Sequence, residues 1–162
     1  DKGSLVVAQE GEFYYPARDG RGRLWFLQNR RPGYAWYGPK ANGWLNVGVG
    51  GMAEQLKANG DSLKRHWNLL TEQLEKAGLV RDYAYKPSGH SYYLRQRRAE
   101  LRQDNAFIAG DAAGLAARDM GEGIHPAVQS GLRAADAILN GTEYTLEGIR
   151  KFSLWSLLRL GG

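Results

Sequence analysis

Two short glycine-containing segments late in the chain carry the residue types best suited to chemistry. Gly110-Asp111 follows an apolar run, and Gly121-Glu122-Gly123 precedes a segment with helical periodicity. Amides at a helix start carry partial positive charge, glycine lets a ligand approach the backbone, and a carboxylate accepts hydrogen bonds from hydroxyls. Together they predict a site for a ligand with hydroxyls and anionic oxygens. Each of the two segments taken singly is more typical of a tight turn.

A strand and a helix are needed to bring these segments together. Phe107–Ala109 is typical of a short buried strand, and Ile124–Leu139 predicts a helix that ends at Asn140-Gly141. Small residues would let the helix lie close to a sheet or a ligand: Ala127, Ser130, Gly131, Ala134 and Ala135. His125, in the first turn, is more typical of a local hydrogen-bonding residue than of an acid or base. No catalytic residue is assigned.

The first part of the chain predicts an antiparallel sheet. Short apolar and aromatic runs are separated by turn residues. The runs are Leu5–Ala8, Phe13–Tyr15, Leu24–Leu27, Tyr34–Tyr37 and Trp44–Val49. Turns at Asp19–Gly22 and Ala41–Gly43 predict two hairpins, because glycine and asparagine tolerate positive φ.

Further elements are expected after this sheet. Apolar residues at helical spacing predict a helix over Asp61–Ala77, with Asp61 or Ser62 as its N-cap and Gly78 just past its end. Ser91–Leu94 is typical of a strand, and Leu146–Leu160 of a closing helix. The composition becomes small and glycine-rich near Asn105, which predicts a sheet-rich domain over 1–104 and a second domain over 105–162.

Composition excludes several kinds of site. The 162 residues include no cysteine, and the three histidines are dispersed, so neither a disulfide framework nor a metal site is expected. The net charge of +5 is modest and predicts no nucleic-acid partner. A phosphate- or nucleic-acid-binding module stays open as an alternative, built from Tyr92, Tyr93, Arg95, Arg97, Arg98 and Arg102.

The hydropathy pattern bears on where the protein works. No apolar run approaches the roughly 20 residues that span a bilayer, and a cytoplasmic protein is expected. The apolar run Phe152–Leu158 leaves peripheral contact with a membrane surface as an alternative, although core packing is the commoner fate of such a helix.

The segment from Asn105 to Gly131 resembles the second flavin-binding motif of the geranylgeranyl reductase family and of the wider flavoprotein monooxygenase superfamily. In that motif Gly-Asp-Ala-Ala-Gly, here residues 110–114, is followed by Gly-Glu-Gly-Ile, here residues 121–124, and a small-residue helix. The resemblance implies that Asp111 binds the ribityl chain of FAD, while backbone amides stabilise negative charge on the reduced ring. It assigns cofactor binding to Gly110, Asp111, Gly114, Gly121, Glu122, Gly123 and Ile124.

A second segment upstream is similar to the same family. Tyr34–Lys40, with the strand residues Asn46–Gly50, resembles a Tyr-x-Trp-x-Phe-Pro segment that lines an isoprenoid cavity. The resemblance implies substrate contacts at Tyr34, Trp36, Tyr37 and Pro39, and aromatic faces suit an apolar polyprenyl chain. This sequence departs at Arg118, where the family usually has Pro, and at Gly38, where it usually has Phe. The second departure removes part of the expected cavity wall.

The two matches imply an α+β fold, in which an antiparallel sheet with packed helices precedes a strand-loop-helix part of an FAD-binding α/β domain. The implied parent is an FAD-dependent oxidoreductase that reduces carbon-carbon double bonds of an isoprenoid-like, lipid-like substrate, with NAD(P)H or another donor reducing the flavin. A flavin monooxygenase or halogenase with the same loop is an alternative, although the lysine signature of halogenases is not found.

The other half of such a flavin site is not found in this sequence. Dinucleotide binding needs Gly-x-Gly-x-x-Gly between a strand and a helix, and the one similar run, Gly48–Ala53, precedes a poor helix at Gln55–Gly60. We therefore expect a fragment that lacks the N-terminal half of its flavin domain and binds FAD weakly or not at all. The unpaired Phe107–Ala109 strand would favour self-association.

Overall fold

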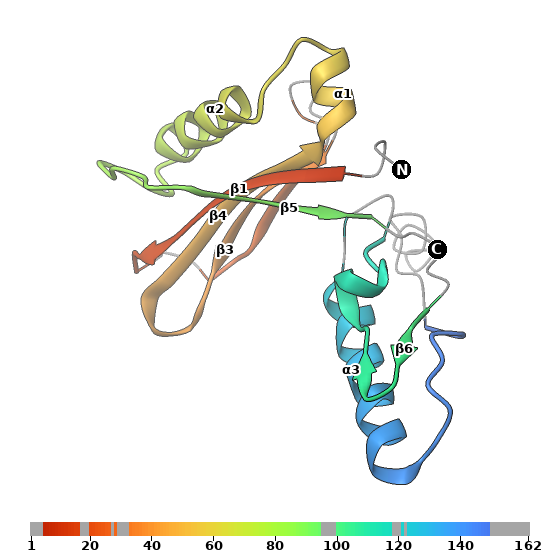
Figure 1. Cartoon of the computed structure of the whole chain (residues 1–162). Helices are drawn as coiled ribbons and strands as arrows, with labels where there is room; N and C mark the ends of the chain where they lie inside the picture. Colours follow the sequence, from red (N-terminus) through yellow and green to blue (C-terminus); the bar gives the residue numbers. More distant parts are fainter. Residues whose placement is uncertain are drawn as a thin grey trace, which may run out of the picture. The chain divides into compact units, whose positions relative to one another are not determined.

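The computed structural model describes residues 5–16, 20–26, 28, 33–94, 100–117, 121 and 123–149. The chain divides into two compact units, residues 1–91 and 92–162 (Figure 1). This division lies ahead of the change in composition near Asn105. None of the helices in the described part of the chain has the length and hydropathy that a membrane crossing requires.

The first unit is built on a five-stranded antiparallel sheet, as the sequence predicts, in the order β2-β3-β4-β1-β5. The strands are β1 (Leu5–Tyr14), β2 (Arg23–Phe26), β3 (Gly33–Pro39), β4 (Trp44–Met52) and β5 (Ser88–Tyr93). The two runs expected at 5–8 and 13–15 belong to one continuous strand, β1. β4 lies between β3 and β1, with Val49 opposite both Ala35 and Gln9.

One of the two predicted hairpins is confirmed and the other is wrong. The turn η3 (Ala41–Gly43) joins β3 to β4, and Asn42 and Gly43 have φ of 58° and 77°. The hairpin expected at Asp19–Gly22 would pair β1 with β2, but β3 and β4 lie between these strands. A local turn signal specifies where the chain reverses, whereas the pairing partner depends on residues far away in the sequence.

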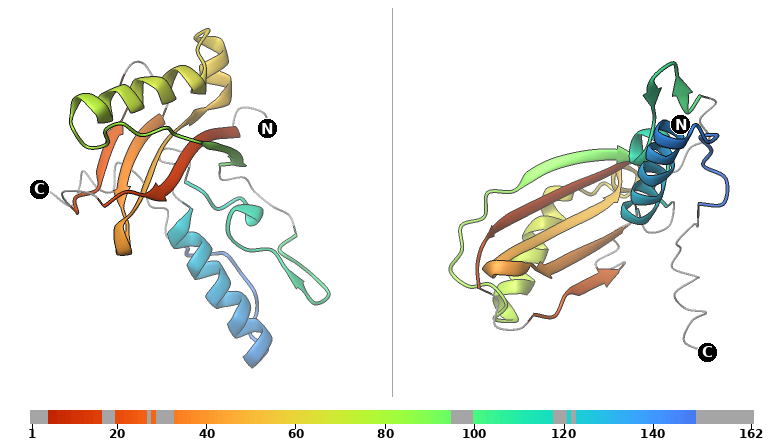
Figure 2. Two further views of the ribbon diagram at one scale, coloured as in Figure 1. Left: turned by 90° about the vertical axis from the view of Figure 1, so that its left-hand side faces the viewer. Right: turned by 90° about the horizontal axis from the view of Figure 1, so that it is seen from below.

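One helix covers one face of this sheet. α2 (Leu63–Lys76) lies against β1 and β4, and the shorter α1 (Ala53–Ala58) follows β4 (Figures 1 and 2). The predicted N-cap is confirmed, because Ser62 Oγ accepts a hydrogen bond from the Arg65 amide at 3.2 Å. The core between helix and sheet consists of Phe13, Ala35, Tyr37, Leu45, Val47, Val49, Trp67, Leu70, Leu74 and Val80.

The second unit contains a small hairpin, a turn and one long helix. The strand expected at Phe107–Ala109 is the two-residue β7 (Ala106–Phe107), which pairs antiparallel with β6 (Arg102–Gln103). α3 (Ile124–Asn140) confirms the predicted helix, and Gly141, with φ of 68°, ends it. Residues 146–149, the start of the expected closing helix, are not helical, and the rest of that prediction lies outside the described residues.

Candidate functional site

A hydrogen-bonded turn holds Asp111 at its surface. The turn is η4 (Gly110–Ala113), and the glycines at its first position and its C-cap, Gly110 and Gly114, have φ of 57° and 66°, which favour glycine. The Gly114 amide donates to the Asp111 carbonyl at 2.9 Å. The Asp111 side chain is exposed, so its carboxylate is available to a ligand.

The Asp111 carboxylate lies beside the N-terminus of α3. Gly123 is the N-cap of that helix, and a Cβ there would come within 2.6 Å of Asp111 Oδ1. A side chain at this position would displace the carboxylate, so glycine leaves room for this approach. The first amides of any helix lack intrahelical acceptors and carry partial positive charge. The arrangement brings a hydrogen-bond acceptor and a helix N-terminus together, as the motif predicts.

Ser130 fastens the Asp111 turn to α3. Its side chain is fully buried, and its Oγ accepts from the Gly110 amide at 2.9 Å and donates to the Ala127 carbonyl at 3.0 Å. A Cβ at Gly110 would lie 3.2 Å from the Ala127 Cβ. Small residues at these positions thus allow the turn to pack directly on the helix.

Tyr92 positions the loop before α3. Its hydroxyl donates to the Gly121 carbonyl at 3.2 Å, and Gly121 has φ of 64°. A Cβ at Gly121 would overlap the Tyr92 hydroxyl. The sequence pattern places Tyr92 in a strand and in a possible basic binding module, but it does not predict this contact with the loop. No local signal in the sequence relates two residues so far apart.

The structure brings together most of the predicted cofactor residues. Gly110, Asp111, Gly123 and Ile124 meet where η4 joins the start of α3, and Ile124 is 80% exposed. Gly114 closes η4 and Gly121 lies on the loop supported by Tyr92. Glu122 and Arg118 lie outside the described residues.

The face of the sheet opposite α2 carries a row of aromatic side chains. Phe26 lies directly opposite Tyr34, and their ring centroids are 5.6 Å apart. Tyr34 in turn lies 5.7 Å from Trp36. The Trp36 ring lies over Gly48, where a Cβ would overlap it. These rings form a continuous apolar surface across β2, β3 and β4.

Strand geometry divides the four residues expected to contact substrate. Alternate residues of a strand point to opposite faces, and Tyr34 and Trp36 share the aromatic face. Tyr37 is 1% exposed and packs in the core beneath α2, opposite Val47. Pro39 has the same parity as Tyr37. Tyr37 and Pro39 therefore lie on the α2 side, away from the aromatic face.

A polar network that was not predicted from the sequence borders the aromatic row. The Trp36 indole donates to Asn46 Oδ1, and Asn46 Nδ2 donates to Glu10 at 3.3 Å and Glu12 at 3.4 Å. Lys40 forms an ion pair with Glu12, and its hydrogen bond holds the pKa of Glu12 below the ordinary value. Polar residues at alternate positions of an apolar strand were a signal for this network.

This network gives the aromatic face a polar end. Glu12 and Lys40, with Ala41 and Trp44, also line a shallow depression beside the turn between β3 and β4. Apolar rings beside carboxylate and amide groups suit a ligand that has an apolar body and a hydrogen-bond donor at one end.

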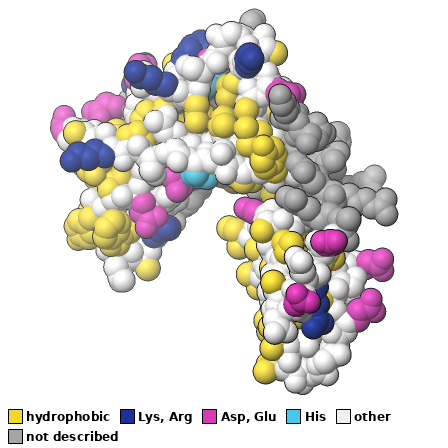
Figure 3. All heavy atoms as spheres, viewed as in Figure 1, with side chains coloured by type: hydrophobic (Ala, Val, Ile, Leu, Met, Phe, Trp, Pro, Cys, Tyr) yellow, Lys and Arg dark blue, Asp and Glu magenta, His cyan; other side chains and the backbone are white. Residues whose placement is uncertain are grey.

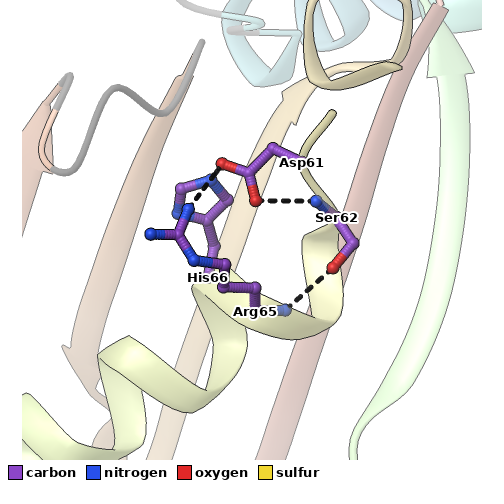
Figure 4. A network of polar contacts seen from close by, with 4 residues as sticks. All are labelled: Asp61, Ser62, Arg65 and His66. Carbon is purple, nitrogen blue, oxygen red and sulfur yellow. Dashed lines mark hydrogen bonds and ion pairs between the residues drawn. The ribbon is translucent and has the colours of Figure 1, made fainter. Parts of the chain in front are cut away.

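A separate polar cluster lies at the start of α2 (Figure 4). Asp61 accepts hydrogen bonds from the Ser62 amide at 2.7 Å and from Arg65 at 3.0 Å, and it lies 2.8 Å from Nε2 of the fully buried His66. The hydrogen bond from the Ser62 backbone amide, together with the Arg65 and His66 contacts, lowers the pKa of Asp61. These contacts all lie at the first turn of α2, so the cluster stabilises that helix.

The basic segment is described only in part. Arg95, Arg97 and Arg98 lie outside the described residues. The Arg102 guanidinium lies 4.8 Å from the Phe107 ring centroid, and its Nε donates to the Asp104 carbonyl at 2.9 Å. Both contacts of Arg102 are therefore with residues of the β6–β7 hairpin to which it belongs. Within the described residues no group of three side chains could hold a metal ion.

Comparison with solved structures identifies the fold. A geranylgeranyl bacteriochlorophyll reductase-like protein from Thermoplasma acidophilum matches 99% of this chain at 20% identity and a TM-score of 0.64. A triple mutant of the flavin-dependent brominase Bmp2 matches 96% at 16% identity and a TM-score of 0.56. The flavin-dependent halogenase CmlS matches 85% at 19% identity and a TM-score of 0.53.

These likenesses establish the fold as one found in flavin-dependent oxidoreductases and halogenases. The matched regions make up 39%, 40% and 26% of the three neighbours' chains. This chain therefore spans less than half of their length. No family model matches the sequence, and no curated protein does either.

Proposed function

We propose that this chain forms the flavin-ring side of the FAD site, together with part of the substrate domain, in an FAD-dependent oxidoreductase. The approach of Asp111 to Gly123 at the start of α3 carries this proposal. The carboxylate would accept hydrogen bonds from the ribityl hydroxyls of FAD. The amides at the helix start would stabilise negative charge on the reduced ring. FAD, when bound, supplies the hydride chemistry.

The proposed substrate is an isoprenoid-like lipid with a carbon-carbon double bond. Its hydrocarbon chain would lie on Tyr34 and Trp36, because apolar surface gains most from contact with aromatic faces. A hydroxyl or another donor at its end would bind Glu10 or Glu12, which Asn46 orients. NAD(P)H is the proposed electron donor in the parent enzyme.

Comparing flavins of different length tests the cofactor proposal. A site that contacts only the ribityl chain and ring should bind riboflavin and FAD with similarly weak affinities, within about threefold, since threefold is less than about 1 kcal/mol. Fluorescence quenching of each flavin by the chain measures this. Asp111→Ala should abolish binding, and Glu143→Ala, at an exposed position of the same unit, should not.

Three results would contradict the cofactor proposal. FAD bound at least about 100-fold more tightly than riboflavin, about 2.7 kcal/mol, would mean that the chain has a pocket for adenosine as well. Unchanged flavin binding by Asp111→Ala would mean that the carboxylate does not contact the flavin. No quenching of either flavin's fluorescence up to the solubility limit of the flavin would mean that this chain has no flavin site.

A flavin-dependent halogenase is the second candidate, because two of the three solved neighbours are halogenating enzymes. The same flavin loop would serve, but an electrophilic halogenating species requires an electron-rich ring as substrate. Titration with farnesol and with indole, followed by isothermal titration calorimetry of the wild type and Trp36→Leu, separates the two. Farnesol binding lost in Trp36→Leu favours the reductase, whereas binding of indole alone favours the halogenase.

A further inference from the structure

The loop before α3 is held at Gly121 by contacts on both sides of the residue. The Gly121 amide donates to the Ala117 carbonyl at 2.9 Å, and the Gly121 carbonyl accepts from the Tyr92 hydroxyl at 3.2 Å. Tyr92 is half-buried and belongs to β5, so a strand presents this hydroxyl. Gly121 has φ of 64°, and a residue without a Cβ adopts other conformations almost as readily. The Tyr92 hydrogen bond therefore selects one orientation of a carbonyl that glycine leaves free to turn.

Side chains supply little unused positive charge in the second unit. No Lys and only two Arg residues, Arg102 and Arg133, lie in its described part. Arg102 donates to the Asp104 carbonyl. Arg133 donates to the Thr145 and Glu147 carbonyls. On the face that Figure 3 shows, Asp and Glu side chains outnumber Lys and Arg over this unit, so among the described groups the backbone amides are the main source of positive potential at the start of α3.

The first turn of α3 offers fewer amides than the start of most helices. Four amides at a helix start have no acceptor within the helix, and here one of the four is missing, because Pro126 has no amide hydrogen. The next amide, that of Ala127, donates to the Gly123 carbonyl at 2.9 Å. The orientation of peptides in the preceding loop therefore matters more here. A Gly121 carbonyl turned towards an anion would place a partly negative oxygen against it and oppose the helix amides.

We propose that Tyr92 is a positioning residue for the loop before α3, and that its hydroxyl strengthens binding of reduced flavin more than binding of oxidised flavin. This inference rests on the proposed flavin site. While the hydrogen bond is in place, the Gly121 oxygen is bound to Tyr92 and is not available to face the ring. The reduced ring carries negative charge and the oxidised ring is neutral, so the orientation of this carbonyl affects the two forms unequally. Tyr92 acts through Gly121.

Comparing reduced and oxidised riboflavin tests this role. Tyr92→Phe keeps the aromatic ring and removes the hydroxyl. The affinity for reduced riboflavin should fall about tenfold more than the affinity for oxidised riboflavin, which makes the midpoint potential of the bound flavin about 30 mV more negative for a two-electron couple. Anaerobic equilibrium dialysis at about pH 8, where an ordinary histidine is neutral, measures both affinities.

Tyr144→Phe is the matched control. The Tyr144 hydroxyl also donates to a backbone carbonyl of the same unit, that of Ile108, at 2.7 Å. Its removal should leave the ratio of the two affinities unchanged, even where it weakens both. A merely structural role of Tyr92 would likewise weaken both affinities equally and leave the midpoint potential where it is in the wild type.

A double-mutant cycle tests the contact itself, without flavin. A Cβ at Gly121 would overlap the Tyr92 hydroxyl oxygen, whereas it would lie at an ordinary 3.5 Å from Cζ of the ring. Gly121→Ala should therefore lower the free energy of unfolding by less in the Tyr92→Phe background than in the wild type, while the strain of a positive φ is common to both. Urea unfolding of the four proteins measures this difference.

The outcomes separate this inference from the proposed flavin site. A wild type that binds neither form of riboflavin would contradict the proposed site and this inference with it. A wild type that binds riboflavin, together with an unchanged ratio of affinities in Tyr92→Phe or an equal change in Tyr144→Phe, would overturn the role of Tyr92 alone. Additive costs in the cycle would mean that Tyr92 and Gly121 are not in contact, which would overturn it as well.

Discussion

The two long helices have the same kind of pattern and opposite surroundings. α2 and α3 both repeat apolar residues along one side. In α2 that side faces the sheet, and Trp67, Leu70 and Leu74 are 6%, 2% and 0% exposed. In α3 it is open, and Leu132 is 67% exposed. Amphipathic periodicity therefore establishes that a helix has an apolar side, but it does not establish what covers that side.

The N-termini of the two helices differ in the same way. α2 begins with Ser62, whose side chain caps the helix, and with the Asp61 cluster beside it. α3 begins with Gly123, which has no side chain and leaves space for the Asp111 carboxylate. The start of α2 is capped by a side chain, whereas the N-cap of α3 has no side-chain cap and lies beside a carboxylate. This contrast is why the second is the candidate binding site.

The largest expected effect comes from a matched pair of leucines. Leu74→Ala should lower the free energy of unfolding by about 2–5 kcal/mol, because it leaves a cavity in the core. Leu132→Ala should change it by less than about 0.5 kcal/mol, because that side chain is exposed. Urea unfolding at concentrations where the chain is monomeric measures both. Equal losses would mean that the apolar side of α3 around Leu132 is covered within one copy.

A smaller effect is expected where η4 is fastened to α3. Ser130→Ala removes the hydrogen-bond partner of the Gly110 amide at a buried position, which should cost about 1–3 kcal/mol of unfolding free energy. Because this bond holds the turn that carries Asp111, riboflavin binding should weaken as well. Loss of stability without any change in flavin affinity would mean that η4 does not contribute to flavin binding.

The smallest effect concerns pH and the capped end of α2. The folded pKa of Asp61 is lowered by its hydrogen bonds, so the ionised carboxylate stabilises the fold above its ordinary pKa. That stabilisation should be lost as pH falls below about 4 and through the lowered pKa. Asp61→Asn should therefore be less stable at neutral pH and show a shallower decline between about pH 6 and about pH 3. An identical decline in both proteins would contradict this role.

Local signals in the sequence predicted the two long helices, α2 and α3, and one tight turn, but not the short helix α1. Ser62, Gly78 and Gly141 mark helix ends in the chain itself, and Asn42-Gly43 adopts the positive φ of its turn. Each signal acts within a few residues, so distant parts of the chain do not alter it. The prediction of a hairpin at Asp19–Gly22 was wrong because the turn signal does not specify the strand with which β1 pairs.

The two candidate sites differ in how far the sequence could predict them. Gly110, Asp111 and Gly123 belong to one contiguous motif, and the structure brings them together. The aromatic face depended on strand parity and register instead. These place Trp36 beside Asn46 and bury the neighbouring Tyr37. Glu10 joined the network because β1 pairs with β4, which no single segment of the sequence specifies.

The sequence by itself determined the helix ends, one tight turn and the glycine-containing motif around Asp111, because caps, glycines and periodicity act between neighbouring residues. The tertiary structure decided which side of each element is used. It assigned Trp36 to an open face and Tyr37 to the core, covered the apolar side of α2, and left that of α3 exposed. Burial is a property of residues that meet across long separations, so it follows from packing and register rather than from the local pattern.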